Sequence, residues 1–198
     1  MSKQNFLLVL GALALMFAGA LGGGFWVAEN WRGGGSRGSD LVGGPFSLVD
    51  HVGRAVTEAD YTDRHTLVYF GYTYCPDACP LGLLTITEAL EQLGEKAGRV
   101  KPLFITVDPE RDTVEVMAAH HEHFHSAFSF LTGTARQIAD VARAYRVYYQ
   151  KSETEDAADY LVDHSTVTYL MAPGGGFLRH FGHAVTADEL AAALKEVL

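Results

Sequence analysis

The residues best suited to chemistry are Cys75 and Cys79, which are the only thiols in this chain of 198 residues. They stand four positions apart in the run Tyr-Cys-Pro-Asp-Ala-Cys-Pro. Thiolates act as nucleophiles, as redox centres and as soft metal ligands. A domain of about 155 residues buries enough apolar surface to fold without disulfide bridges. We therefore expect the pair to serve chemistry rather than to hold the fold together.

The segments around the cysteines predict a strand followed by a helix. Residues 64–72 contain a continuous apolar run at 66–71, which is typical of a strand buried on both faces. Apolar residues then recur at helical spacing from Leu81 until Gly94, and Pro80 suits the first turn of a helix. The partial positive charge at a helix N-terminus lowers the pKa of thiols placed there. The spacing is one residue wider than Cys-x-x-Cys. It still permits a disulfide, and it also leaves both sulfurs open to a third ligand.

His164 is the candidate third ligand. It precedes a predicted strand over residues 165–171, and in thioredoxin-like folds the loop before the corresponding strand faces the cysteine helix. A lone loop histidine is most often a hydrogen-bonded structural residue, but a position opposite two thiolates favours a ligand. Asp77, between the two cysteines, could support a metal ligand from behind or contact a docking partner. It could equally be an exposed acid at the start of the helix. Asp163 would orient the ring of His164.

The remaining elements predict an α/β thioredoxin-like fold with a central mixed sheet flanked by helices and an extra N-terminal hairpin. The hairpin turns at residues 51–53, and a capping box of Thr186 and Glu189 opens the last helix. The other expected elements are strands at 100–107, 165–171 and 177–181 and helices at 113–124 and 134–145. This order places the cysteines at the tip of the first helix after a central strand.

The N-terminal part predicts a membrane anchor and a tether. Residues 6–28 carry no charge, and as a helix they would be about 35 Å long, enough to cross a bilayer core of about 30 Å. An Ala-Gly-Ala run at residues 18–20 resembles a signal-peptide cleavage site, but the apolar run continues beyond it, so we favour a retained span. The expected organisation is a tail at 1–5, a transmembrane anchor at 6–28, a Gly-rich linker at 29–40 and a thioredoxin-like domain at 41–198.

Two other clusters have both a functional and a structural interpretation. The Asp-Pro-Glu-Arg-Asp-Thr segment at 108–113 could hold a metal or a phosphate, but we favour a turn and helix cap with an internal Arg–carboxylate network. Four histidines follow, at positions 120, 121, 123 and 125. On a helix, His121 and His125 would be neighbours that could chelate a divalent metal, although a solvated surface is the commoner outcome.

Taken together, the motifs resemble the Sco/SenC family, which are copper-binding assembly factors of cytochrome c oxidase. The resemblance runs from Leu41 to the C-terminus and rests on segments 74–80, 107–113, 131–134, 144–149 and 162–165. It implies that Cys75, Cys79 and His164 bind copper, as Cu(I) or Cu(II), for delivery to the CuA centre of the oxidase. Leu81 departs from the family pattern, in which a small polar residue is common, and we expect no effect on metal binding.

Three functions compete on these residues. The first is a copper metallochaperone. The second is a thiol-disulfide oxidoreductase that uses Cys75 and Cys79 as a redox pair to keep the CuA cysteines of the oxidase reduced. The third, a peroxide sensor or peroxidase, fits worst because the Pro-x-x-x-Thr-x-x-Cys pattern is absent. Only the first function requires His164.

The expected partners are subunit II of cytochrome c oxidase, an upstream copper donor protein and, through the N-terminal helix, a membrane. The net charge of −9 argues against binding to nucleic acid. Because the N-terminus lacks an Arg-rich transit peptide, we favour a bacterial inner membrane, with the globular domain in the periplasm, over the mitochondrial inner membrane. In that oxidising compartment, Cys75 and Cys79 would form a disulfide when metal-free.

Overall fold

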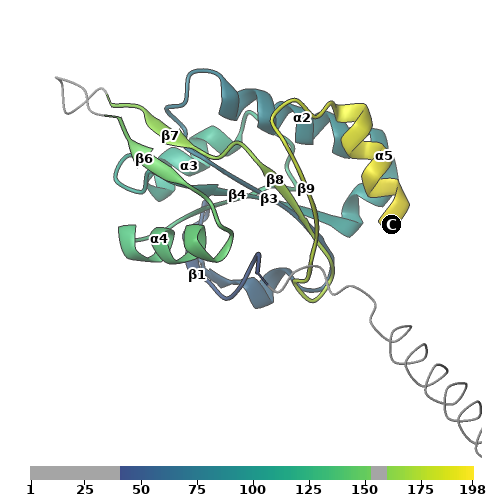
Figure 1. Ribbon diagram of the computed structural model, residues 1–198, viewed down its shortest axis with the longest axis horizontal. Helices are drawn as coiled ribbons and strands as arrows, with labels where there is room; N and C mark the ends of the chain where they lie inside the picture. The colour runs from purple at the N-terminus through teal and green to yellow at the C-terminus, as the bar shows by residue number, and fades with distance from the viewer. Residues whose placement is uncertain (1–40, 153–159) are drawn as a thin grey trace, which may run out of the picture. The chain divides into compact units, whose positions relative to one another are not determined.

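The computed structural model describes residues 41–152 and 160–198 (Figure 1). A seven-stranded mixed sheet with the order β2-β1-β5-β4-β3-β8-β9 forms its centre. The strands of this sheet are β1 Ser47–Asp50, β2 Ala55–Thr57, β3 His65–Gly71, β4 Val100–Thr106, β5 Ser129–Thr132, β8 Thr168–Met171 and β9 Phe177–Phe181. A separate antiparallel pair consists of β6 Tyr149–Lys151 and β7 Val162–His164.

Strand β3, which leads into the cysteine segment, lies between β4 and β8 in the sheet. It runs parallel to β4 and antiparallel to β8, and β8 pairs in turn with antiparallel β9. All seven residues of β3 are buried, as the apolar run predicts. The strand order and directions agree with the expected thioredoxin-like arrangement, and the predicted N-terminal hairpin is confirmed as β1 and β2.

The helices cover both sides of this sheet. They are α2 Ala78–Leu93, α3 Val114–His121, α4 Ala135–Ala144 and α5 Ala187–Val197, with short 3-10 helices at Glu58–Tyr61 and Gly94–Arg99. Helices α2 and α5 lie side by side above the sheet in Figure 1, and α4 lies below it. Thr186 and Glu189 form the predicted capping box at the start of α5.

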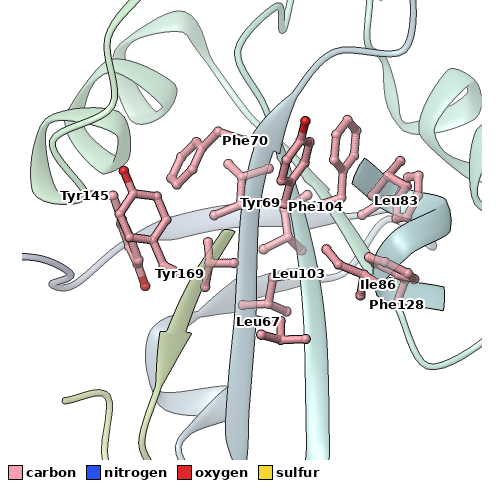
Figure 2. Close-up of a cluster of buried hydrophobic side chains, with 14 of the residues drawn as sticks. Leu67, Tyr69, Phe70, Leu83, Ile86, Leu103, Phe104, Phe128, Tyr145 and Tyr169 are labelled. Carbon is pink, nitrogen blue, oxygen red and sulfur yellow. The ribbon is translucent and has the colours of Figure 1, made fainter. Parts of the chain in front are cut away.

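Neighbouring residues of β3 fill the two sides of the core, because side chains alternate along a strand. The hydroxyl of Tyr69 donates to the carbonyl of Ala78 in α2 at 3.3 Å. Phe70 points the other way, and its ring centroid lies 5.4 Å from that of Tyr145 at the end of α4 (Figure 2). The first turn of α2, which carries Cys79, is therefore tied to the central strand.

The structure corrects several element boundaries. Helix α3 ends at His121 rather than at residue 124, because the chain turns there and packs Phe124 and Phe128 against Phe130. Strand β8 begins at Thr168 rather than at residue 165. Strand β5, which was not expected, adds to β4 in parallel and is completely buried. The β6–β7 pair was not expected either.

The predicted membrane span at 6–28, with the tail at 1–5 and the linker at 29–40, lies outside the described residues. Within residues 41–152 and 160–198, no helix is both long enough and apolar enough to span a bilayer.

Candidate metal centre

Cys75 and Cys79 lie at the junction between strand β3 and helix α2. The strand ends at Gly71, and α2 begins at Ala78, so Cys75 belongs to the connecting loop and Cys79 to the first helical turn. Cys75 is partly buried and Cys79 is fully buried, and neither sulfur is in a disulfide. The backbone amide of Cys79 donates to the Sγ atom of Cys75 at 3.4 Å. The helix N-terminus therefore offers a donor to the sulfur of Cys75, as the sequence predicts.

His164 meets the two cysteines. It is the last residue of β7, and its Nε2 atom lies 3.3 Å from the Sγ atom of Cys79. The two sulfurs and a ring nitrogen of His164 all lie within 4.8 Å of one another. It is the one such group of three or more potential ligands among residues 41–152 and 160–198. The structure thus brings together the three residues that the sequence singled out.

The ring of His164 is oriented by the backbone. Its Nδ1 atom lies 3.1 Å from the carbonyl oxygen of Ser165. A carbonyl only accepts hydrogen bonds, so Nδ1 must carry the proton, and the lone pair of the neutral ring is then on Nε2. That lone pair faces the sulfur of Cys79. A donor bond from the far ring nitrogen is the usual arrangement for a metal-binding histidine.

The expected role of Asp163 in orienting this ring is not seen. Asp163 is exposed, and adjacent residues of a strand point to opposite sides, so its side chain is directed away from the ring. The carbonyl of Ser165 takes the role instead. Asp77 is the exposed N-cap residue of α2, and its side chain makes no capping hydrogen bond.

The two thiols differ in acidity. The hydrogen bond with Cys79 lowers the pKa of Cys75 to about 3, and the backbone amides of Asp77 and Cys79 act in the same direction. The same contact with Cys75, together with burial, raises the pKa of Cys79. Metal-free protein at neutral pH therefore holds a thiolate at Cys75 and a thiol at Cys79. A cation that gains both sulfurs as thiolates must displace the second proton.

Gly71 allows the helix to approach the end of β3. A Cβ atom at this position would lie 2.7 Å from the Sγ atom of Cys79 and 2.8 Å from the ring of Phe104. Neither neighbour has room to move, because both are fully buried. The absence of a side chain at Gly71 therefore helps to fix the position of one of the sulfurs.

Asp112 fixes the start of the cysteine loop. Its buried carboxylate accepts hydrogen bonds from the hydroxyl of Thr73 at 2.5 Å, from the backbone amide of Thr73 at 3.1 Å and from the hydroxyl of Thr106 at 2.5 Å. Burial raises the pKa of Asp112. The residue belongs to the 108–113 segment, whose favoured structural interpretation is confirmed, since Arg111 pairs with Asp108 and Thr113 caps α3.

The histidine cluster does not form a comparable group. Because α3 ends at His121, His125 is not on the same helical face, and its Nδ1 atom accepts from the amide of Ala127 at 3.1 Å. His120 packs among Phe104, Phe124 and Phe130 instead of facing solvent. His121 stacks on His51, with ring centroids 4.1 Å apart. The cluster therefore contributes mainly to packing.

Comparison with known proteins finds a matching family model and several similar sequences. The sequence model of the SCO1/SenC family matches residues 34–198. A mitochondrial SCO1 homologue of Arabidopsis thaliana is 46% identical over 156 residues, which are 78% of this chain and 46% of that protein. This chain spans about half the length of the curated relatives that it matches.

Two solved structures with copper bound are also similar. Arabidopsis thaliana ScoI is 45% identical, with a TM-score of 0.74 over 78% of this chain and 96% of that one. Bradyrhizobium japonicum ScoI is 43% identical, with a TM-score of 0.74 over 79% of this chain and 99% of that one. Similar proteins thus include a mitochondrial one and one from Bradyrhizobium.

Proposed function

This chain belongs to the SCO1/SenC family, and from that premise we propose that it is a copper metallochaperone for the CuA centre of cytochrome c oxidase. Cys75, Cys79 and His164 bind the copper ion. The observation that carries this proposal is the convergence of two sulfurs and one imidazole nitrogen within 4.8 Å. Copper is the cargo, and subunit II of the oxidase is the recipient.

The donor set suits both oxidation states of copper. Thiolates are soft ligands that prefer Cu(I), and imidazole binds both Cu(I) and Cu(II). Two thiolates and a neutral imidazole carry a charge of about −2, so the loaded site would carry a single negative charge with Cu(I) and would be neutral with Cu(II). A disulfide between Cys75 and Cys79 would remove both thiolates, so the oxidised form should not hold the metal.

The position of the site suits transfer. Cys79 is fully buried, whereas Cys75 and His164 are only partly buried, so the ion is reachable from one side. An incoming ligand of the recipient can therefore attack the metal before both sulfurs have left it. An upstream copper donor would load the reduced site by the reverse of this exchange.

A transfer assay tests the proposal. The purified, reduced chain is loaded with Cu(I) and mixed with a copper-free soluble CuA domain of subunit II. A one-electron oxidant is then added, and the absorption of the mixed-valence CuA centre is recorded. We expect the centre to form with the wild-type chain and not with the Cys75→Ser, Cys79→Ser double variant. Equal formation with the double variant would show that free copper, and not this chain, is the donor.

A thiol-disulfide oxidoreductase is the second candidate, and the partly exposed sulfur of Cys75 favours it. Cys75 would attack a disulfide of the CuA cysteines and release one thiolate. Cys79 would then attack the sulfur of Cys75, release the other partner thiol and leave a Cys75–Cys79 disulfide. A dithiol reductant would have to restore the pair. The raised pKa of Cys79 slows the second step, because the thiolate is the nucleophile.

The location belongs to the same proposal. A retained span at residues 6–28 would anchor the chain in a bacterial inner membrane, with residues 41–198 in the periplasm. The uncharged length of the run and the need for an accessible oxidase partner support this topology. A reporter fused after Leu198 should be active if it needs the periplasm, and a fusion that is active only in the cytoplasm would exclude the topology.

A further inference from the structure

Arg111 contacts both of the segments that carry the proposed copper ligands. Its guanidinium carbon lies 4.8 Å from the ring centroid of Tyr74 and 5.7 Å from that of Tyr72, in the segment that leads to Cys75. It lies 3.7 Å from the ring centroid of Tyr160, in the segment that leads into β7 and His164. Its Nη1 atom also donates to the carbonyl oxygen of Tyr160 at 2.9 Å. These distances are in the range of cation–π contacts.

The guanidinium of Arg111 forms an ion pair with the carboxylate of Asp108. The Nε atom of Arg111 donates to this fully buried carboxylate. The hydroxyl of Tyr160 donates to the other carboxylate oxygen at 2.7 Å, and the amide of Asp108 donates to the hydroxyl of Thr106 in β4 at 2.9 Å. Asp108, Arg111 and Tyr160 therefore form one hydrogen-bonded unit that is fixed to the end of a core strand.

The same unit continues to His164. The amide of Val162 donates to the hydroxyl of Tyr72 at 3.2 Å. The ring of Tyr72 then meets the ring of His164 at nearly a right angle, with centroids 5.8 Å apart. Tyr72 is thus in contact with the guanidinium on one side and with the metal-binding strand on the other.

The position of Arg111 carries an energetic cost, so a contribution to stability alone does not explain it. The Nη2 atom of Arg111 is buried and has no hydrogen-bond partner among the described residues. A buried donor without a partner is unfavourable. The planar, always charged guanidinium nevertheless reaches Asp108, the carbonyl of Tyr160 and three aromatic rings at once, which the ammonium group of a lysine cannot do.

We propose that Arg111 is a positioning residue that holds β7 at the distance from the cysteine loop at which His164 reaches copper. This inference rests on the proposed copper function. It implies that Arg111 sets the affinity for Cu(II) relative to that for Cu(I). Two thiolates hold Cu(I) nearly linearly, whereas Cu(II) prefers a larger ligand set that includes the imidazole.

The test compares two variants at cationic side chains near the ring of Tyr160: one changes the cation at Arg111, and the other removes the cation at Lys151. Arg111→Lys keeps the positive charge beside Asp108. It loses the planar guanidinium, with its several hydrogen-bond donors and its stacking on the tyrosine rings. We expect its Cu(II) affinity to fall about tenfold or more, as for other changes behind a ligand, while its Cu(I) affinity changes by less than about twofold. Lys151→Gln is the matched control. The Nζ atom of Lys151 lies 4.5 Å from the same ring centroid but pairs with exposed Glu110, so neither affinity should change.

A second variant and a metal-free readout guard against simple misfolding. Tyr160→Phe removes only the hydroxyl bond to Asp108, and it should shift the Cu(II) affinity in the same direction by a smaller factor. In the metal-free protein, Arg111→Lys should alter the NMR signals of the His164 ring, and Lys151→Gln should not. Normal Cu(II) binding and unchanged ring signals in Arg111→Lys would overturn the inference. So would equal losses of both copper states.

If wild-type protein binds neither copper ion, the proposed function fails. The ring signals still report in that case whether Arg111 positions His164, so the two failures are distinguishable.

Discussion

The Nε2 atom of His164 lies 3.3 Å from the Sγ atom of Cys79, although 85 positions separate the two residues in the chain. The contact joins the end of β7 to the first turn of α2. Because the Nδ1 proton is engaged with the carbonyl of Ser165, the free lone pair of His164 is aimed at the cysteine pair. The three side chains are therefore already arranged as the proposed three-ligand metal centre requires.

Cys75 should react as a thiolate across the neutral range. Its pKa is lowered to about 3 by the contact with Cys79, whereas Cys79 is buried and has a raised pKa. In reduced, metal-free protein, the rate of alkylation of Cys75 should be nearly constant between about pH 5 and pH 8, because the thiolate fraction is already complete. Mass spectrometry of the labelled peptide would measure it. A rate that rises about tenfold per pH unit would contradict the assignment.

Oxidation should close a bridge between Cys75 and Cys79 and prevent copper binding. The sulfurs lie within 4.8 Å of each other and differ in exposure, so an oxidant should reach Cys75 first and Cys79 should then complete the disulfide. We expect oxidised, metal-free protein to show no alkylatable thiols and no bound copper after incubation with Cu(I) or Cu(II). Two freely alkylated thiols after oxidation would refute this prediction.

Gly71→Ala should disturb both the fold and the site. The new methyl group would lie 2.7 Å from the sulfur of Cys79. Overpacking of this kind costs about 1–3 kcal/mol in the free energy of unfolding. Displacement of the sulfur should also weaken copper binding. Urea unfolding of metal-free protein measures the first effect, with Gly98→Ala as the control, because a Cβ atom at Gly98 would meet nothing within 4 Å. Equal stability of the two variants would argue against the close approach.

Stability should fall in mild acid because of four histidines. Burial is the first cause that lowers the pKa of four histidines below the ordinary value of 6.5, namely His51, His65, His120 and His121. The unfolded chain then binds more protons than the folded one, so the free energy of unfolding decreases as the pH falls below about 6.5.

A substitution at His120 isolates one of these contributions. His120→Phe places an apolar ring among Phe104, Phe124 and Phe130 and should flatten the dependence of the melting temperature on pH. An unchanged slope for His120→Phe would show that the acid sensitivity has another origin.

The sequence was sufficient to predict the central part of the fold and the three residues that converge at the candidate site. The buried strand at His65–Gly71, the helix that Gly94 ends and the capping box at Thr186 all have strong local patterns. The cysteines were identified by their place between strand and helix. His164 was found by its place opposite that helix, although it lies in strand β7 rather than in a loop.

The parts that were missed depend on contacts far apart in the chain. Strand β5 has only four residues, and β6 and β7 have three each, so they are too short for a periodic pattern. Asp112 and Arg111 were assigned to a local network. Their contacts with Thr73, Tyr74 and Tyr160 appear only when the loops come together. The family motifs mark these segments, but spacing alone does not show which of their side chains meet.

The most direct test of the central claim is the copper content of the purified, reduced chain with and without the His164 side chain. We expect wild-type protein to bind one equivalent of Cu(I) or Cu(II). Cys75→Ala and Cys79→Ala should each lose tight binding of both ions, because a charged soft ligand is removed. His164→Ala should keep some Cu(I) between the two thiolates but lose the Cu(II)–thiolate absorption. Normal Cu(II) binding by His164→Ala, together with full assembly of the oxidase in cells, would contradict the three-ligand account and favour the thiol-disulfide oxidoreductase instead.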